Sequence, residues 1–259
     1  MISIFAKPMG ALMHLIYSGV SFLDSTYISS YAIAIILSTI ILKLVLLPLT
    51  IKQTKSMKKM QDLNPKLQEL QKKYKNDPQT LQRKTMEIYK ENNANPMSGC
   101  LLLLIQFPIL IAFFYVLRDP VQYMFHDQAI YDALNKSFLW IKDLGYASNY
   151  IFEDGIVNGL SMGGISLPFV GAALPILAFI SAFTTYYTSK MTQSSQAVAN
   201  EQQKATQNTM TIMMPIMIFV FALQFPAGLA LYWVVSNIFQ LAQQIIIFNK
   251  SQNLQEELK

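Results

Sequence analysis

The run from Tyr31 to Ile51, YAIAIILSTIILKLVLLPLTI, holds a single charged residue, Lys43, in an otherwise apolar segment. At a rise of about 1.5 Å per residue, a helix of this length crosses the roughly 30 Å hydrocarbon core of a bilayer. A helix satisfies all of its backbone hydrogen bonds internally, which a segment surrounded by lipid requires. This run therefore predicts a helical membrane protein.

Further apolar runs bring the predicted number of membrane spans to five. The runs at 97–117 and 167–187 each have the length of one span, and the stretch 210–248 has the length of two. Phe225-Pro226-Ala227-Gly228 divides that stretch, because Pro and Gly favour a tight turn between helices. The composition, 53% hydrophobic and 14% charged, agrees with an integral membrane protein. We expect an all-α polytopic protein with spans at 27–51, 96–117, 167–188, 209–225 and 229–249.

Basic residues are concentrated in one of the predicted loops. Eleven of the 20 Lys and Arg residues lie between Lys52 and Lys90, whereas the loop 118–166 has three basic and six acidic residues. The positive-inside rule therefore places the segment 52–95 in the cytoplasm and the loop 118–166 outside. Alternation along the chain then predicts an external N-terminus, a cytoplasmic loop at 189–208 and a cytoplasmic tail at 250–259.

The first 26 residues are apolar but interrupted by Lys7, Pro8 and His14. This pattern predicts an amphipathic segment at 1–26 that lies in the membrane interface. An uncleaved, signal-like span is the alternative.

The cytoplasmic segment 52–95 is expected to form a hairpin of two helices. Three Asn-Pro or Asp-Pro pairs, at 64–65, 77–78 and 95–96, predict helix starts in which the polar residue caps the helix. The middle pair separates the two helices. Apolar residues recur at spacings of three and four, which predicts one buried stripe: Met57, Met60, Leu63, Leu67, Leu70 and Tyr74.

The outer face of this hairpin is expected to be basic. It could contact a polypeptide or a partner protein, or it could serve only to orient the chain against anionic headgroups. The candidate contact residues are Lys58, Lys59, Lys66, Lys72 and Lys73.

Lys43 lies about two helical turns from the end of its apolar run. A lysine at the centre of a span costs about 2.5 to 3.5 kcal/mol, so an intramembrane lysine is a candidate functional residue. Snorkelling of its ammonium group to the headgroups is the alternative. Thr39 lies one turn earlier, so Thr39 and Lys43 share a helix face.

The other polar residues of the predicted spans are neutral. Gln106 falls in the second span, and Trp233, Ser236 or Asn237, Gln240 and Gln244 recur at helical spacing in the fifth. They could line a hydrated cavity, or they could join helices by hydrogen bonds. One cation among neutral polar groups suits transient binding of polar or acidic peptide.

Several function classes lack their characteristic residues. No predicted span contains Asp or Glu, which weighs against a proton-coupled carrier. Both histidines, His14 and His126, lie outside the spans, and the chain has no HExxH, GxSxG or Gly-rich phosphate loop. We therefore expect no enzymatic activity, no cofactor and no metal site.

Several segments together resemble the YidC/Oxa/Alb family of membrane protein insertases. They extend over nearly the whole chain and include KLVLLPLTIKQ, NPMSGCLLLLIQFPILIAFFYVLR, FLWIKDL, LPIL and FPAGLALYWVVSNIFQLAQQ. Five spans with an external N-terminus resemble the Gram-positive bacterial members. The resemblance implies a bundle of five helices with a hydrophilic groove that is open to the cytoplasm and closed outside.

By this resemblance, the cation of the groove falls on Lys43, its threonine on Thr39 and its aromatic residue on Trp233, beside Tyr232. Bacterial members more often have arginine at the position of Lys43, and lysine keeps the charge but loses the bidentate fork. We expect the groove to be lined by Lys43, Thr39, Trp233, Tyr232, Gln106, Ser236, Asn237 and Gln240.

The functional hypothesis is an insertase and chaperone of the bacterial plasma membrane, acting alone or with the Sec translocon. Its expected partners are nascent membrane proteins and anionic lipids, with the Sec translocon and the ribosome as further candidates and no nucleic acid. We expect a monomer, because one bundle can enclose the groove. A small-solute carrier or channel, or a scaffold for other membrane complexes, are the alternatives.

Overall fold

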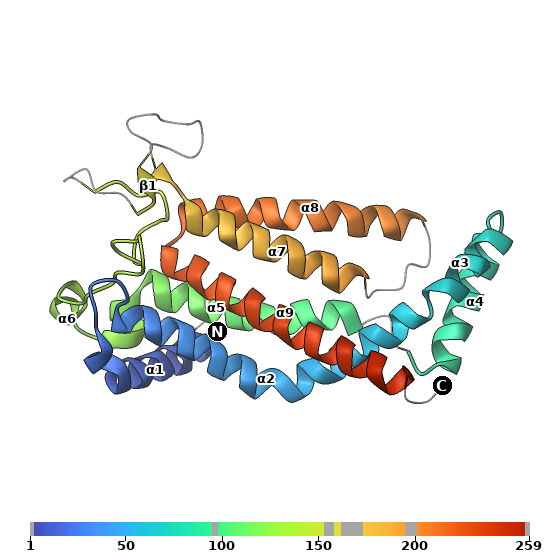
Figure 1. Cartoon of the computed structure of the whole chain (residues 1–259), viewed down its shortest axis with the longest axis horizontal. Coiled ribbons are helices and arrows are strands. Elements are labelled where there is room, and N and C mark those ends of the chain that lie inside the picture. Colours follow the sequence, from blue (N-terminus) through green and yellow to red (C-terminus); the bar gives the residue numbers. More distant parts are fainter. Residues whose placement is uncertain (1–2, 95–97, 153–157, 162–172, 195–200, 257–259) are drawn as a thin grey trace. The chain divides into compact units, whose positions relative to one another are not determined.

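The computed structural model describes residues 3–94, 98–152, 158–161, 173–194 and 201–256 (Figure 1). The helices longer than ten residues are α1 (Ser3–Val20), α2 (Ser30–Asp62), α4 (Pro78–Glu91), α5 (Ser98–Arg118), α7 (Ile176–Ser194), α8 (Glu201–Gln224) and α9 (Ala227–Glu256). The shorter elements are η1 (Ser21–Leu23), α3 (Asn64–Lys73), the π-helical segment η2 (Val121–Phe125), α6 (Gln128–Asp132), and the antiparallel pair β1 (Leu160–Ser161) and β2 (Ala173–Leu174). The predicted helical class is thus confirmed, with one strand pair of two residues each.

Within the described residues, three helices are long and apolar enough to cross a membrane: Ser30–Asp62 in α2, Ala205–Gln224 in α8 and Ala227–Ile247 in α9. A shorter apolar helix, Leu104–Arg118, forms most of α5. The fifth predicted span corresponds to α9. The total of five spans remains a prediction, with α5 and α7 as the other two candidates.

The chain divides into two compact units. The first comprises residues 1–44, 106–185 and 215–238, and the second comprises 45–105, 186–214 and 239–259. Helices α2, α5, α7, α8 and α9 each contribute residues to both units.

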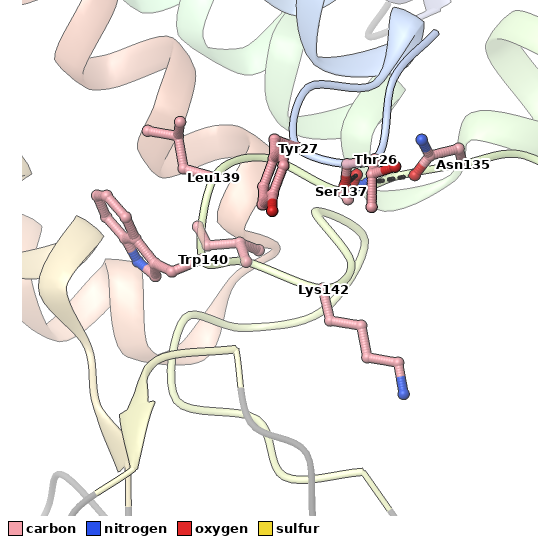
Figure 2. Close-up of a pocket in the computed structure, with 8 residues that line it drawn as sticks. Thr26, Tyr27, Asn135, Ser137, Leu139, Trp140 and Lys142 are labelled. Carbon is pink, nitrogen blue, oxygen red and sulfur yellow. Dashed lines mark hydrogen bonds between the residues drawn. The ribbon is translucent and has the colours of Figure 1, made fainter.

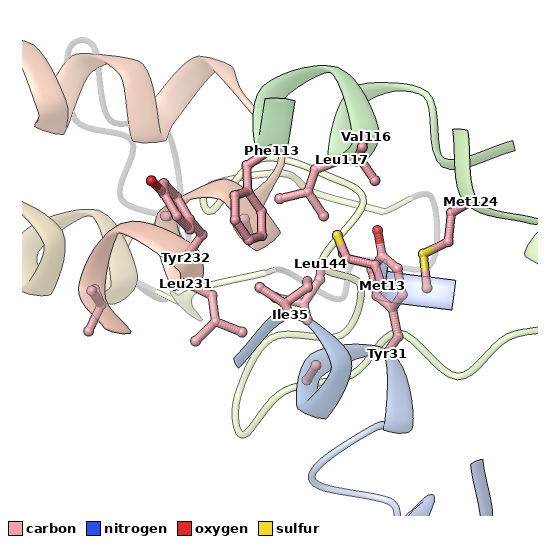
Figure 3. Close-up of a cluster of buried hydrophobic side chains, with 14 of the residues drawn as sticks. Met13, Tyr31, Ile35, Phe113, Val116, Leu117, Met124, Leu144, Leu231 and Tyr232 are labelled. Atoms are coloured by element: carbon pink, nitrogen blue, oxygen red, sulfur yellow. The ribbon is translucent and has the colours of Figure 1, made fainter. Parts of the chain in front are cut away.

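The core of the first unit is formed by side chains of α1, α2, α5 and α9 together with the loop that contains Leu144 (Figure 3). Helix α1 comes very close to η2 at Gly10, where an added Cβ would lie 1.9 Å from the carbonyl oxygen of Tyr123. No side chain fits there, so glycine is required. The largest fully buried core side chains include Tyr31, Ile35, Phe113 and Tyr232.

The turn between α8 and α9 is held by the loop that contains Leu144 and Tyr146. The backbone amides of Ala227 and Gly228 donate to the carbonyl oxygens of Tyr146 and Leu144, at 2.7 and 2.9 Å. The predicted tight turn at 225–228 is thus confirmed. Asn158 is buried and orders the same loop, since its side chain bonds the backbone of Lys142, Asp143 and Ala147.

In the second unit, α3 and α4 pack as the predicted hairpin around a small core (Figure 1). That core contains Met60, Leu63, Leu67, Tyr89 and Ala94, with Ile88 packed against it. Part of the predicted stripe is therefore buried as expected.

Asp77 caps α4 as predicted, because its carboxylate accepts a 3.0 Å hydrogen bond from the amide of Thr80 and Pro78 follows it. The predicted cap at Asn64 is wrong. Leu63 is the residue before α3, no side chain caps this helix, and Asn64 is its first residue. The third predicted cap, at Asn95-Pro96, lies outside the described residues.

Several predicted element boundaries differ from the helices. Helix α2 continues past the predicted end of the first span at residue 51 to Asp62, so residues 52–62 are a helical extension of that span. Helix α7 begins after Pro175 and continues to Ser194, later at both ends than the predicted span 167–188. Residues 167–172 lie outside the described residues. Helix α8 begins at Glu201, so much of the predicted loop 189–208 is helical.

Candidate functional site

Lys43 on α2 is joined to α9 through a residue of α5. Its ammonium Nζ donates a 3.1 Å hydrogen bond to Oε1 of Gln106, and Nε2 of Gln106 donates a short hydrogen bond to the phenol oxygen of Tyr232. Ser236 follows Tyr232 by one helical turn on the same face of α9, and it is buried as well. Three helices of the first unit therefore meet in one chain of hydrogen bonds that starts at a cation.

The Gln106 amide is oriented by its two partners. Its oxygen faces the ammonium group and its nitrogen faces the phenol, so the negative end of the amide dipole lies next to the positive charge. This arrangement stabilises the ammonium without neutralising it. Among the described residues, no carboxylate forms an ion pair with Lys43.

The ammonium group of Lys43 retains hydrogen-bonding capacity. A lysine has three N–H donors, and one of them is used on the described part of the chain. Lys43 is half-buried, so its remaining donors can reach water or an acceptor on a bound molecule. The site can therefore attract anionic or carbonyl-rich segments.

Tyr232 is fixed firmly in the core. It is 1% exposed, and its ring stacks on Phe113 of α5 with 4.1 Å between ring centroids. Phe113 lies seven residues, about two turns, after Gln106, so one face of α5 holds both the ring and the phenol of Tyr232.

A second set of hydrogen bonds joins α9 to α7. Nε1 of Trp233 donates to Oγ1 of Thr185 at 2.8 Å. Nδ2 of Asn237 donates to the same oxygen at 2.9 Å and to Oγ1 of Thr184 at 3.1 Å. These contacts match the alternative in which polar side chains join helices.

Helix α9 thus presents two different polar faces. Tyr232 and Ser236 are four residues apart and face the Lys43 chain, whereas Trp233 and Asn237 are also four apart and face α7. Consecutive helical residues differ by about 100° in direction, so each pair contacts a different neighbour.

Two other predicted groove residues are not part of the Lys43 chain. Thr39 is 1% exposed, and its hydroxyl donates at 2.7 Å to the carbonyl oxygen of Ile35 in its own helix. Gln240 is half-buried and belongs to the second unit. In that unit, the side-chain amides of Gln243 and Gln244 on α9 donate hydrogen bonds to Thr50 and Thr192.

Four of the five predicted hairpin lysines are exposed, namely Lys59, Lys66, Lys72 and Lys73. Lys58 is different: its side chain is 17% exposed and pairs with Asp62 at 3.1 Å. These four exposed lysines therefore lie at the end of α2 and on α3.

Sequence reasoning did not select Phe113, Thr184 or Thr185 for this site. The spacing of Phe113 from Gln106 and the hydroxyl pair near the end of an apolar run are signals that could have selected them. The partners of Gln106 depend on the packing of three helices, for which the sequence has no local signal.

The fold and the site together define a polytopic helical membrane protein with a cation held by neutral partners between its helices. The family model described as "60Kd inner membrane protein" matches residues 22–255. The chain belongs to this family, the YidC/Oxa/Alb family of membrane proteins.

Individual relatives agree with this assignment. The chain is 39% identical to "Membrane protein insertase YidC" of Clostridium perfringens (strain 13 / Type A) over 93% of this chain and 90% of that protein. It is 35% identical to "Membrane protein insertase YidC 2" of Bacillus anthracis over 88% of this chain and 76% of that protein. It is also 39% identical to "Membrane protein insertase YidC" of Pelodictyon phaeoclathratiforme, a longer protein, over 85% of this chain and 33% of that protein.

A solved structure agrees as well. A crystal structure described as an active YidC insertase with its first transmembrane domain resolved matches with a TM-score of 0.52 and 27% identity. The match covers 93% of this chain and 45% of that one.

Proposed function

We propose that this protein is a membrane protein insertase that helps newly made membrane proteins to enter the bilayer and fold. The observation that carries the proposal is the 39% identity with the Clostridium perfringens insertase over nearly the full length of both chains. The function follows the family rather than a catalytic site, so we propose no enzymatic step.

Lys43 is the proposed working residue. Its charge, held by the Gln106 amide and not neutralised by any carboxylate of the described residues, would keep water between α2, α5 and α9. Water at this depth shortens the apolar distance that a polar segment has to cross. The charge would also attract acidic residues of the incoming polypeptide, and the absence of a bidentate fork would let them leave again.

The two faces of α9 divide the predicted groove residues between two roles. Lys43 and Gln106 are proposed to contact the substrate or its water, and the buried Tyr232 and Ser236 are proposed to support Gln106 from α9. Trp233 and Asn237 are proposed to hold α9 against α7, with Thr39 as a packing residue of α2.

The proposed location is the bacterial plasma membrane, with five spans, the N-terminus outside and the C-terminus inside. The charge distribution of the loops supports this orientation. A hydrophilic groove that is open to the cytoplasm, action with or without the Sec translocon, and a monomeric state belong to the same proposal.

The α3–α4 hairpin is proposed to contact the incoming polypeptide first. Its exposed lysines could equally contact anionic lipid, so the test has to separate these two partners. Reversing Lys66 and Lys72 to Glu should reduce crosslinking of a nascent chain to the hairpin. If only binding to anionic vesicles falls, the hairpin is a lipid contact.

The insertase proposal is tested in cells depleted of their own insertase. Plasmids would supply the wild-type chain or the variants Lys43→Arg, Lys43→Ala and Lys43→Glu, with equal membrane levels confirmed by immunoblot. Insertion of a single-spanning substrate with an acidic external tail is then measured by protease protection. We expect Arg to support insertion and Ala and Glu to impair it; insertion at the wild-type level by both would contradict the role of the charge.

A crosslinking experiment separates insertion from solute transport. A photoreactive residue at position 43 should crosslink to a stalled nascent membrane protein, whereas the same probe at Ser38, which is fully buried, should not. A carrier would instead produce solute flux in proteoliposomes and no crosslink.

A further inference from the structure

Leu139 and Trp140 form the tip of a tight turn, where large apolar residues are unusual. The backbones of Phe138 and Ile141 exchange two hydrogen bonds, at 2.9 and 2.8 Å. Leu139 and Trp140 are the two residues of the turn between them. Glycine, asparagine and aspartate are the ordinary choices in such turns. Here the two positions hold large apolar side chains.

The backbone at Leu139 makes this choice more surprising. Its φ is 53°, and a positive φ at the first turn position is a conformation that glycine adopts without strain and a leucine rarely does. A bulky side chain in this conformation has a cost that packing usually offsets. Yet Leu139 is 46% exposed and Trp140 is 36% exposed, so little of that packing comes from the chain itself.

The turn is tied to the residues immediately before α2, which is a candidate membrane-spanning helix. The amide of Leu139 donates to the carbonyl oxygen of Tyr27 at 2.6 Å, and the amide of Ser29 donates to the carbonyl oxygen of Ser137 at 3.0 Å. Helix α2 begins at Ser30, the next residue. Because an extended chain advances about 3.3 Å per residue, the tip lies within roughly 10 Å of the start of the apolar run.

That distance corresponds to the headgroup layer. A bilayer is about 40 to 45 Å thick with its headgroups and about 30 Å without them, which leaves several ångströms on each side. Tyrosine and tryptophan are enriched at this level because their rings are apolar and their edges are polar.

Other exposed apolar side chains lie at the same level. Tyr27, whose carbonyl holds the turn, is 71% exposed, and it lines a shallow surface pocket together with Leu139 and Trp140 (Figure 2). Phe22 and Leu23 of η1 are exposed as well. They are held near the start of α2, because the hydroxyl of Ser30 donates to the carbonyl oxygen of Ser21.

We propose that the Leu139–Trp140 turn is a lipid anchor, with both side chains seated in the headgroup layer at the Ser30 end of α2. In Figure 2, the two side chains extend to one side of the turn and Lys142 extends to another. The anchor would fix the loop that also holds the α8–α9 turn, and so would set the depth of the bundle in the membrane. The proposal requires only that α2 crosses the bilayer and is independent of the insertase function.

The chain's tryptophan content makes the test direct. Its two tryptophans are Trp140 and Trp233, so the variant Trp233→Phe leaves Trp140 as the single reporter. The full-length variant is reconstituted into phosphatidylcholine–phosphatidylglycerol vesicles. The phosphatidylcholine is brominated either near the glycerol end or near the methyl end of its acyl chains, and aqueous iodide is the third quencher.

We expect Trp140 emission to be blue-shifted relative to that of the unfolded chain. It should be quenched more by bromine near the glycerol end than by bromine near the methyl end, and protected from iodide. The matched variant Trp140→Phe reports on Trp233 alone. If Trp233→Phe does not fold, the Trp140 signal is obtained by subtracting the Trp140→Phe spectrum from the wild-type spectrum.

Two outcomes would overturn the proposal. Full access to iodide with no quenching by either bromolipid would place the turn in water. Protection from iodide without bromolipid quenching would mean that protein covers the turn, either a second copy or a partner. Neither outcome would alter the insertion assay, so failure of the anchor and failure of the insertase function are distinguishable.

Discussion

Gln106 lies between the ammonium group of Lys43 and the phenol of Tyr232, accepting from the first and donating to the second. A neutral residue thus occupies the place where a glutamate would form an ion pair. Because a carboxylate would neutralise Lys43, the amide at position 106 preserves the charge of the site.

The variant Gln106→Glu should therefore reduce insertion of an acidic-tailed substrate about as far as Lys43→Ala does. The added carboxylate would pair with the ammonium group, and its shape would leave the helix packing unchanged. Protease protection in insertase-depleted cells measures the effect. Gln106→Met is the control, since it has a similar length and leaves the charge of Lys43 in place. Insertion by the Glu variant at the level of the Met variant would show that neutralising Lys43 is not what matters.

Tyr232 contributes through its ring and through its phenol, and two variants separate these contributions. Tyr232→Phe keeps the stacking on Phe113 but leaves the Gln106 amide without its acceptor, which should cost about 1 to 3 kcal/mol. Tyr232→Ala also loses the buried ring and should cost about 3 to 5 kcal/mol, as for large core residues. Thermal unfolding in detergent, followed by circular dichroism, measures both. Equal unfolding midpoints for Tyr232→Phe and Tyr232→Ala would mean that the buried ring adds nothing beyond the hydrogen bond of the phenol.

Thr185 accepts hydrogen bonds from both Trp233 and Asn237, so Thr185→Val should weaken the contact between α7 and α9. Hydrogen bonds between helices in membranes are worth about 0.6 to 2 kcal/mol each, and two are removed here. Thr184→Val is the matched control, because that side chain accepts one hydrogen bond from the same Asn237 amide. We expect a larger fall in the unfolding midpoint for Thr185→Val. A larger fall for Thr184→Val would mean that the hydroxyl of Thr185 is not the main link.

The sequence predicted where helices begin and turn better than it predicted which helices contact one another. The proline and glycine at 226–228 and the capping residue Asp77 are local signals, and the α8–α9 turn and the start of α4 follow them. At Asn64 the local signal was misleading, because α2 continues almost to the start of α3 and leaves no room for an extended cap residue.

The candidate site was predicted as a set of residues and not as an arrangement. Lys43 and Gln106 are 63 residues apart, and their hydrogen bond depends on how far α2 and α5 are shifted along each other. The polar residues of α9 were interpreted as one stripe, whereas Tyr232 and Trp233 contact different helices. Periodicity identifies a face of a helix but does not identify its neighbour.

Asp77 should make the start of α4 sensitive to pH. Hydrogen bonds from Thr80 hold the pKa of its carboxyl below the ordinary 3.8. A lowered pKa in the folded state means that the cap stabilises the hairpin at pH values above the ordinary pKa, and that this stabilisation is lost as the pH falls through the lowered value. Hydrogen exchange at residues 79–82 of the full-length protein, corrected for intrinsic rates, should therefore increase on acidification.

The variant Asp77→Asn is the control for this titration. Asparagine also caps helices and does not ionise, so its exchange should be independent of pH over the same range. Asp77→Ala should show fast exchange at every pH. A pH dependence that persists in the Asn variant would assign the effect to another group, with Glu87 as the candidate because its pKa is also lowered, by Lys84.

Leu139 offers the last prediction, since its strain and its proposed contact with lipid have opposite effects. Leu139→Gly removes the side chain from a residue with a φ of 53°, and relief of a left-handed conformation of this kind is worth about 1 kcal/mol. In detergent we therefore expect a higher unfolding midpoint for the Gly variant than for the wild type. In phospholipid vesicles the gain should shrink, because the variant also loses an apolar side chain from the headgroup layer. Leu139→Ala, which keeps the strain and loses the lipid contact, should be less stable than the wild type in vesicles. An equal gain for Leu139→Gly in detergent and in vesicles would mean that the leucine side chain does not contact lipid.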